Sequence, residues 1–458
     1  MSQSPMSRAN PTWKVLLALL ALVLAVAVWV VALVDSLNRP SVTATLSLQQ
    51  QEMALLAEPA VPVQVRPLLV GTDPQQTLRK ALSDIPLVQL DDRQRLTLAA
   101  LTPIPDERSA VLGEPPASAS LIPLQDALLA RSGGPPELTA AEQRLLVSLD
   151  GDPLLMQLSC RAFGGRESDC VDRSLSQTMA LRLLLSSGLP ALALLVGSGL
   201  LLRHLWLLVR RSMQPWPALI AMPLSLTDMV LLVAGGFVLL GEVLAPVIVS
   251  PLSAALTRGV ESPLSEALTV LIGYATLAVP PLLILWQQMK SVGAVKPPVD
   301  GWLQWRFRPW GSAFLKGGRG WLMVMPPVIL TAWLIGTLVG DQGGSNPLLE
   351  LVFRSRDPFA QVLLATTAVV LAPLFEEVVF RGVLLPVLGT VLGRGWGVIL
   401  SALVFAVAHL SIGELPPLLV LGLGLAMLRL STGRLFPCVV MHALWNAFTF
   451  VNLVLLGG

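Results

Sequence analysis

Three short motifs near the C-terminus place ionisable and amide side chains within strongly apolar sequence. In chain order they are Glu376 and Glu377 with Arg381, Phe405 with His409, and His442 with Asn446. A carboxylate can act as a general base toward water, while imidazole and amide groups can assist it and stabilise an oxyanion. Ionisable side chains inside membrane spans usually face the bundle interior or an aqueous cavity. We therefore expect one Glu and two His, from three helices, to form one wet reaction centre.

Helical geometry separates the expected roles. Glu377 and Arg381 are four residues apart, share a helix face and are predicted to pair. Glu376 projects about 100° away, so Arg381 cannot easily neutralise both carboxylates. Taken singly, a residue such as His409 or Asn446 is more often an interhelical hydrogen-bond partner than a catalytic group. The ordered set of three motifs favours the reaction centre over these structural roles.

The elements that position these residues are predicted to be membrane helices. The chain has 458 residues, of which 54% are hydrophobic and only 13% charged, against about 25% charged in soluble domains. Spans of roughly 20 apolar residues are needed to cross a bilayer. We expect an all-α polytopic membrane protein with about nine of them, near residues 15–34, 180–202, 221–249, 265–287, 321–340, 359–376, 396–411, 415–430 and 435–456.

Charge and composition divide the chain further. We expect residues 1–34 to be a cytoplasmic N-terminus and a retained anchor helix rather than a signal peptide, because no A-x-A cleavage site follows the apolar run. Residues 35–178 are Pro-rich and read as a mainly helical insert. Residues 179–320 form the first part of the bundle and residues 321–458 its catalytic core. Most basic short loops fall on one side if the N-terminus is cytoplasmic, which makes the insert extracytoplasmic.

Three cysteines exclude a disulfide-rich scaffold, and a net charge of +2 disfavours nucleic-acid binding. Cys160 and Cys170, both in the insert, could form a disulfide or remain free thiols, and the sequence leaves both readings open.

The motifs Glu-Glu-x-x-x-Arg, Phe-x-x-x-His and His-x-x-x-Asn resemble the signature of the CPBP intramembrane proteases. That family includes the type II CAAX prenyl endopeptidases and bacterial proteins linked to bacteriocin self-immunity. The resemblance covers about residues 321–458, and no named position departs from it. It implies that Glu376 and His409 activate water and that His442 and Asn446 hold the oxyanion. Glu377 and Arg381 would then brace the site, with Phe405 packed beside it.

A metal is a second possibility for the same site. The family is described both as metalloproteases and as metal-free glutamate enzymes. The chain has no His-Glu-x-x-His, yet Glu376, His409 and His442 could supply three ligands to a divalent ion such as zinc. We favour water activated by Glu and His without a required cofactor, and leave the metal open.

The expected function is therefore an intramembrane endopeptidase acting on membrane-embedded or lipid-anchored protein substrates. We expect a multi-pass protein of a bacterial plasma membrane, with an unidentified partner for the insert. One alternative is a non-catalytic membrane scaffold or bacteriocin-immunity-type binding protein. A proton-coupled transporter is a weaker alternative, because the early spans show no matching repeat of the motifs. The site is expected toward the cytoplasmic side, because Glu376 would end a span running inward.

Overall fold

The computed structural model describes residues 11–39, 42–113, 115–131, 138–149, 151–212, 215–293, 295–340 and 344–457, and these contain helices but no β-strand. The chain divides into two compact units, which are Ala44–Leu189 and the combination of Met1–Thr43 with Pro190–Gly458. The first contains most of the predicted insert and the second is the membrane bundle.

The insert begins with short helices: α2 (Val42–Ala57), α3 (Arg66–Leu69), α4 (Pro74–Ser83), α5 (Asp92–Leu101), α6 (Pro105–Val111), α7 (Ile122–Ala130), α8 (Ala140–Ser148), α9 (Pro153–Ala162) and α10 (Glu167–Cys170), with 3-10 turns η1 (Glu58–Ala60), η2 (Leu87–Gln89) and η3 (Ala119–Leu121). The bundle contains α1 (Thr12–Ser36), α11 (Arg173–Val209), α12 (Leu226–Val230), η4 (Leu231–Leu244), α13 (Ala245–Leu256), α14 (Leu264–Ser291), α15 (Trp310–Leu338), α16 (Pro347–Arg354), α17 (Pro358–Ala365), η5 (Thr366–Leu371), α18 (Ala372–Glu377), η6 (Val378–Leu384), α19 (Leu385–Val391), α20 (Arg394–Val407), α21 (Leu415–Thr432) and α22 (Phe436–Gly457). The segments η4, η5 and η6 are π-helical.

Among the described residues, eight helices are long and apolar enough to cross a membrane. They confirm an all-helical, multi-pass membrane protein. The ninth expected span, near 396–411, corresponds to α20, which has only 14 residues. At 1.5 Å per residue it is about 21 Å long, short of a hydrocarbon core of about 30 Å.

The expectation that a span ends at Glu376 is wrong. One continuous helix runs through Pro358–Val391 for 34 residues, and Glu376 lies near its middle. The charged motif looked like a span end because unpaired charges are costly in the membrane. Inside the bundle Glu377 is instead paired with Arg381 and Glu376 accepts a hydrogen bond from Tyr274, so the helix continues. Two π-helical segments, η5 and η6, flank the turn that carries the two carboxylates, and such segments are frequent at functional sites.

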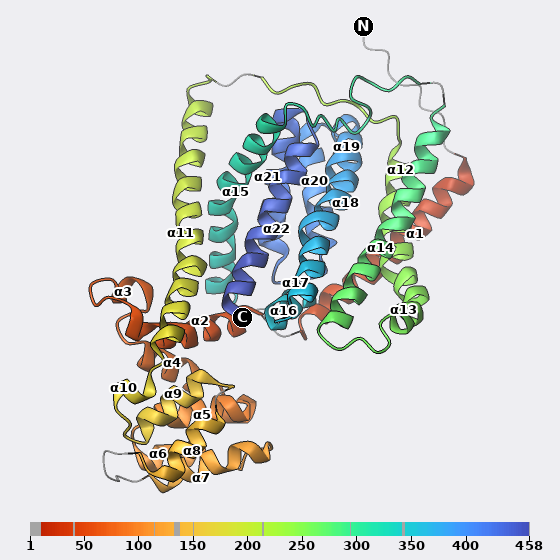
Figure 1. Cartoon of the computed structure of the whole chain (residues 1–458). Helices are drawn as coiled ribbons and strands as arrows, with labels where there is room; N and C mark the ends of the chain where they lie inside the picture. The colour runs from red at the N-terminus through yellow and green to blue at the C-terminus, as the bar shows by residue number, and fades with distance from the viewer. Residues whose placement is uncertain are drawn as a thin grey trace. The chain divides into compact units, whose positions relative to one another are not determined.

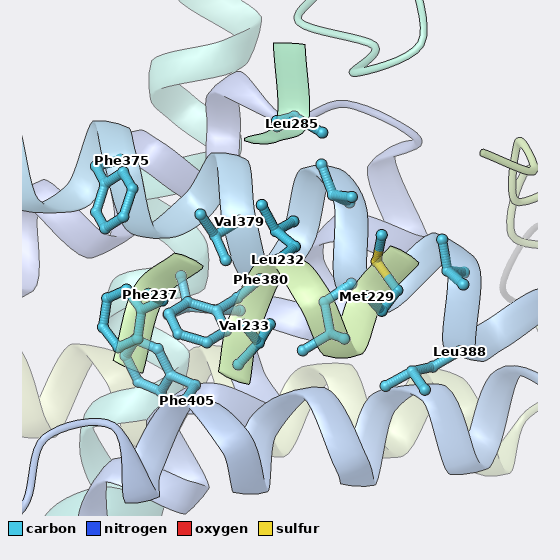
Figure 2. Packing of buried hydrophobic residues seen from close by; sticks show 14 of the residues in the cluster. Met229, Leu232, Val233, Phe237, Leu285, Phe375, Val379, Phe380, Leu388 and Phe405 are labelled. Atoms are coloured by element: carbon cyan, nitrogen blue, oxygen red, sulfur yellow. The ribbon is translucent and has the colours of Figure 1, made fainter. Parts of the chain in front are cut away.

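A hydrophobic core joins this long helix to its neighbours (Figure 2). Phe237 of η4 stacks on Phe375 of α18 with ring centroids 5.9 Å apart. Phe380 of η6 packs edge-on against Phe405 of α20 at 5.5 Å. These contacts fix the carboxylate-bearing turn between the first half of the bundle and the helix that precedes His409.

Small residues allow the helices of the C-terminal core to approach closely. Figure 1 shows α15, α21 and α22 side by side, and α15 packs on both of the others. A Cβ on Gly317 of α15 would lie 2.7 Å from Cβ of Val440 on α22. Likewise, a Cβ on Gly422 of α21 would lie 3.1 Å from Ala402 of α20. Such close backbone approach is typical of membrane helix packing, and it sets the position of α22, which carries His442.

The insert has its own apolar core and polar links. Asp73 caps α4 by accepting a hydrogen bond from the backbone of Gln76, as its sequence predicts. Arg93 bridges Glu52 and Asp152. Burial lowers the pKa of Arg93, but its hydrogen bonds to these two carboxylates outweigh burial and raise the pKa above its usual value.

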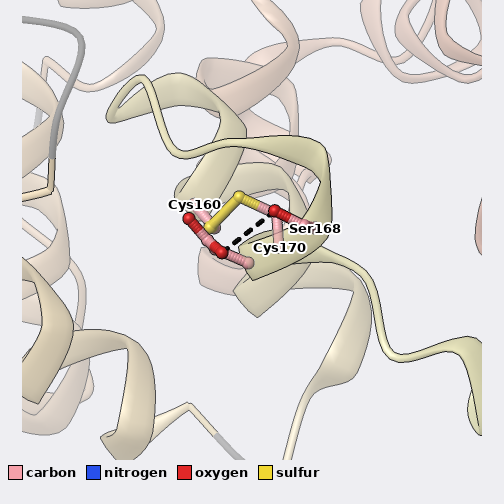
Figure 3. Close-up of a disulfide and its surroundings, with 4 residues drawn as sticks. Cys160, Ser168 and Cys170 are labelled. Atoms are coloured by element: carbon pink, nitrogen blue, oxygen red, sulfur yellow. Dashed lines mark hydrogen bonds between the residues drawn. A yellow bond between two sulfur atoms is a disulfide. The ribbon is translucent and has the colours of Figure 1, made fainter.

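A disulfide joins Cys160 and Cys170 (Figure 3), whose Cα atoms are 5.5 Å apart. It ties the end of α9 to α10. Of the two readings that the sequence left open, the structure has the paired one.

Candidate active site

A fully buried ion pair forms the base of the site. Glu377 is the last residue of α18, and Arg381 lies one turn later in η6. The Arg381 guanidinium donates to Glu377 Oε1 at 2.9 Å, and both side chains are 0% exposed. Arg381 also donates to the Gly422 carbonyl at 3.2 Å and lies over the Phe405 ring at 4.2 Å. The predicted pair is therefore present and has several partners, which a buried charge requires.

His442, on α22, lies between the two glutamates. Its Nδ1 is 3.0 Å from Glu377 Oε1, and its Nε2 is 3.9 Å from Glu376 Oε2. Because Glu377 is paired with Arg381 and accepts as a carboxylate, His442 Nδ1 carries the proton in this contact. The contact with Glu377 fixes the ring orientation and leaves Nε2 facing Glu376.

His409 follows the C-terminal end of α20. Its Nδ1 is 2.8 Å from the Phe405 carbonyl, which can only accept, so Nδ1 is the donor and Nε2 of the neutral ring is free to accept a proton. The Phe405 ring contacts both histidine rings, with centroids 4.8 Å from His409 and 5.6 Å from His442. Within the described residues, no hydrogen bond or ion pair links His409 directly to Glu376, so the structure joins them only through neighbours.

Asn446 anchors α22 to the π-helical segment η5. Its Nδ2 donates to the Ala368 carbonyl at 2.8 Å. A π turn shifts the regular backbone pairing, and the amide satisfies one carbonyl there. This bond uses one of the two amide hydrogens. The second hydrogen can still be donated, and the amide oxygen can still accept a hydrogen bond.

The structure adds one residue that the sequence motifs did not reveal. Tyr274, on α14, donates its hydroxyl to Glu376 Oε1 at 3.0 Å. Its ring packs edge-on against Phe375 at 6.1 Å. Tyr274 is the single tyrosine of the chain and lies in an apolar helix. A single tyrosine in an apolar helix could have indicated a functional residue. Nothing in the sequence, however, linked it to Glu376, which is 102 positions away.

The two neighbouring carboxylates have different surroundings. The Glu377 side chain is fully buried, whereas that of Glu376 is 14% exposed. Glu376 Oε2 is itself buried and has no hydrogen-bond partner among the described residues. Buried polar atoms are almost always hydrogen-bonded. This oxygen can therefore accept a hydrogen bond from a water molecule or a substrate. Glu377 Oε2 and Arg381 Nε lie deeper and also lack partners in the described chain.

The described residues do not form a cluster of side chains that could bind a metal ion. Among them, no group of three or more His, Cys, Asp or Glu side chains is arranged to hold an ion. Glu376 and His442 approach each other, but among the described residues no hydrogen bond or ion pair brings His409 to either of them, and the Phe405 ring contacts both histidines. The arrangement therefore does not fit the three-ligand site of Glu376, His409 and His442, and the metal alternative stays a prediction without structural support.

Comparison with protein families supports the interpretation of this region. Residues 358–448 match the family model described as type II CAAX prenyl endopeptidase Rce1-like. The chain carries a CPBP-family domain. This CPBP domain runs from the start of α17 into α22 and includes all seven residues of the three motifs. Tyr274 lies outside the matched range.

The match places the CPBP domain in a protease family. Residues 43–181, which cover most of the insert, match a separate domain of unknown function (DUF8675). Neither the curated proteins nor the solved structures give a match to the chain.

Proposed function

We propose that this protein is an intramembrane endopeptidase that hydrolyses membrane-embedded or lipid-anchored protein substrates with water activated by Glu376. The observation that carries the proposal is the state of Glu376 Oε2. It is buried without a partner, belongs to a helix that crosses the bundle, and lies 3.9 Å from His442 Nε2. That separation is too long for a direct hydrogen bond and suits a bridging water.

In this mechanism Glu376 takes a proton from water as the water oxygen attacks the scissile carbonyl. The proton then passes to the leaving nitrogen, which restores the Glu376 carboxylate. Neutral His409, with Nε2 as acceptor, assists the removal of the proton. The second amide hydrogen of Asn446 stabilises the oxyanion, and His442 joins it from Nε2 when that nitrogen carries a proton in addition to the one on Nδ1. Glu377 orients His442 through Nδ1, in the way that the third member of a catalytic triad orients its histidine.

The position of Glu376 near the middle of Pro358–Val391 favours cleavage within the thickness of the membrane rather than at its cytoplasmic face. A substrate segment would then enter sideways between helices. We also propose that the protein resides in a bacterial plasma membrane with its N-terminus in the cytoplasm and the insert, residues 35–178, outside. The distribution of Lys and Arg among the short loops supports this orientation.

The proposal is tested by comparing membrane-protein fragments in cells that carry wild type, Glu376→Gln or His409→Ala. Glu242→Gln is a matched control, because Glu242 is another intramembrane glutamate of the bundle and contacts Trp29 rather than the site. Fragments should form with wild type and Glu242→Gln and disappear with the other two variants. Equal cleavage by Glu376→Gln would contradict the proposal. Loss of cleavage on chelation, restored by zinc, would favour the metal alternative instead.

A further inference from the structure

Tyr274 comes from a helix outside the matched CPBP region and reaches the proposed general base. Its helix, α14, packs against α17 and η5, the two segments that precede the carboxylate turn. Its hydroxyl donates to Glu376 Oε1 at 3.0 Å, while its ring packs on Phe375, the residue before Glu376. Two independent contacts thus hold the ring and the hydroxyl at the same turn of the long helix.

The two oxygens of Glu376 are therefore not equivalent. Oε1 accepts from Tyr274, and Oε2 has no partner in the described chain and lies on the side of His442 Nε2. A carboxylate on a side chain with three torsions would otherwise sample several orientations. A hydrogen bond to one oxygen, donated by a rigid ring, selects the orientation in which the other oxygen faces the histidine.

We infer that Tyr274 is a positioning residue for the proposed reaction, which fixes the Glu376 carboxylate so that Oε2 can take the proton of the attacking water. This inference rests on the proposed function. It assigns no contact between Tyr274 and the substrate, because its hydroxyl is already directed to Oε1. The effect of removing that hydroxyl should therefore fall on the chemical step and not on substrate binding.

Tyr274→Phe keeps the ring contact and removes only the hydroxyl. Loss of one hydrogen bond to a charged group should lower kcat about 10- to 100-fold, with KM unchanged. Thr276→Val is the matched control on the same helix, since the Thr276 hydroxyl bonds to the Ile272 carbonyl of its own helix at 2.7 Å. This control should leave both constants at wild-type values. A kcat of Tyr274→Phe equal to that of Thr276→Val would overturn the inference.

A second measurement reports the contact without using activity. Because Tyr274 is the only tyrosine, ring-¹³C-tyrosine gives the tag-free, full-length chain a single labelled residue. The NMR resonance of its hydroxyl-bearing carbon should move in Glu376→Ala and stay in place in Glu350→Ala, a glutamate on α16 paired with Arg354. A resonance unmoved by Glu376→Ala would refute the contact. Cleavage unaffected by Glu376→Gln, with the resonance still responding to Glu376→Ala, would instead remove the proposed function and leave the contact standing.

Discussion

Glu376 and Glu377 are adjacent in sequence, yet their environments separate their roles. Glu377 is fully buried, and its carboxylate is already paired with Arg381 and His442. Glu376 is partly exposed, bonded to Tyr274 through one oxygen and unpartnered at the other. Neighbouring carboxylates in contrasting surroundings are a recurring arrangement at hydrolytic sites, where one group supports and the other reacts.

The buried ion pair of Glu377 and Arg381 leads to a prediction about the free energy of unfolding. Arg381→Met should leave the buried Glu377 carboxylate without its main partner and lower the free energy of unfolding by about 3–5 kcal/mol. Arg354→Met is the control, because Arg354 also pairs with a glutamate four residues away, but the two side chains are 74% and 39% exposed. Its expected loss is at most about 0.5 kcal/mol. Detergent-solubilised variants compared by denaturant unfolding would show this contrast, and similar losses for both would contradict it.

Residue spacing predicted some contacts and not others. The pair of Glu377 with Arg381 follows from one helix turn, and the structure contains it. The bond between His442 Nδ1 and Glu377, and that between Tyr274 and Glu376, join residues 65 and 102 positions apart. Such contacts depend on how three helices pack, which the spacing within each motif does not determine.

At the scale of elements, the sequence located most spans but misjudged two boundaries. The charged motif suggested a helix end at Glu376, and pairing inside the bundle removes the reason to end there. The apolar run near 396–411 suggested a full span, whereas regular α20 stops at Val407, before His409. Both differences arise because hydropathy does not register the pairing of charges inside the bundle or the turn that carries His409.

Close packing of α15 on α22 leads to a second prediction. Gly317→Ala should place its Cβ 2.6–2.8 Å from atoms of Val440 and Pro437 and lower the free energy of unfolding by about 1–3 kcal/mol. It should also reduce cleavage, because α22 carries His442. Gly336→Ala, on the same helix, meets nothing within 4 Å and should be neutral or stabilising by up to about 1 kcal/mol. Thermal unfolding in detergent measures both, and equal stability of the two variants would disprove the close packing.

On the scale of the whole molecule, the chain combines a CPBP domain, earlier membrane helices and a separate insert. Composition alone predicted the multi-pass bundle, because charge is scarce and apolar runs are long. It could not predict that α14, outside the matched CPBP range, carries Tyr274 to within hydrogen-bond distance of Glu376. The insert has two apolar clusters and a disulfide of its own. The mainly helical insert agrees with the expectation from the sequence. A partner of the insert stays a prediction.

The disulfide and the proposed orientation together predict a thiol count. Disulfides form and persist mainly in oxidising compartments, so the pair in the insert supports the proposed extracytoplasmic location. After denaturation without reductant, only Cys438, the free buried cysteine, should react with a maleimide, and all three cysteines should react after reduction. Cys438→Ala should show no adduct before reduction. Three adducts on the unreduced wild-type chain would contradict the disulfide and remove its support for the orientation.

We propose that Glu376 activates a water molecule and that this water cleaves a peptide bond in a membrane substrate. The direct measurement is mass spectrometry of the peptide termini formed when purified protein and a membrane-protein fraction are incubated in ¹⁸O-labelled water. We expect new C-terminal carboxylates that carry ¹⁸O with wild type and Glu242→Gln, and none with Glu376→Gln. Labelled termini formed equally by Glu376→Gln would contradict it.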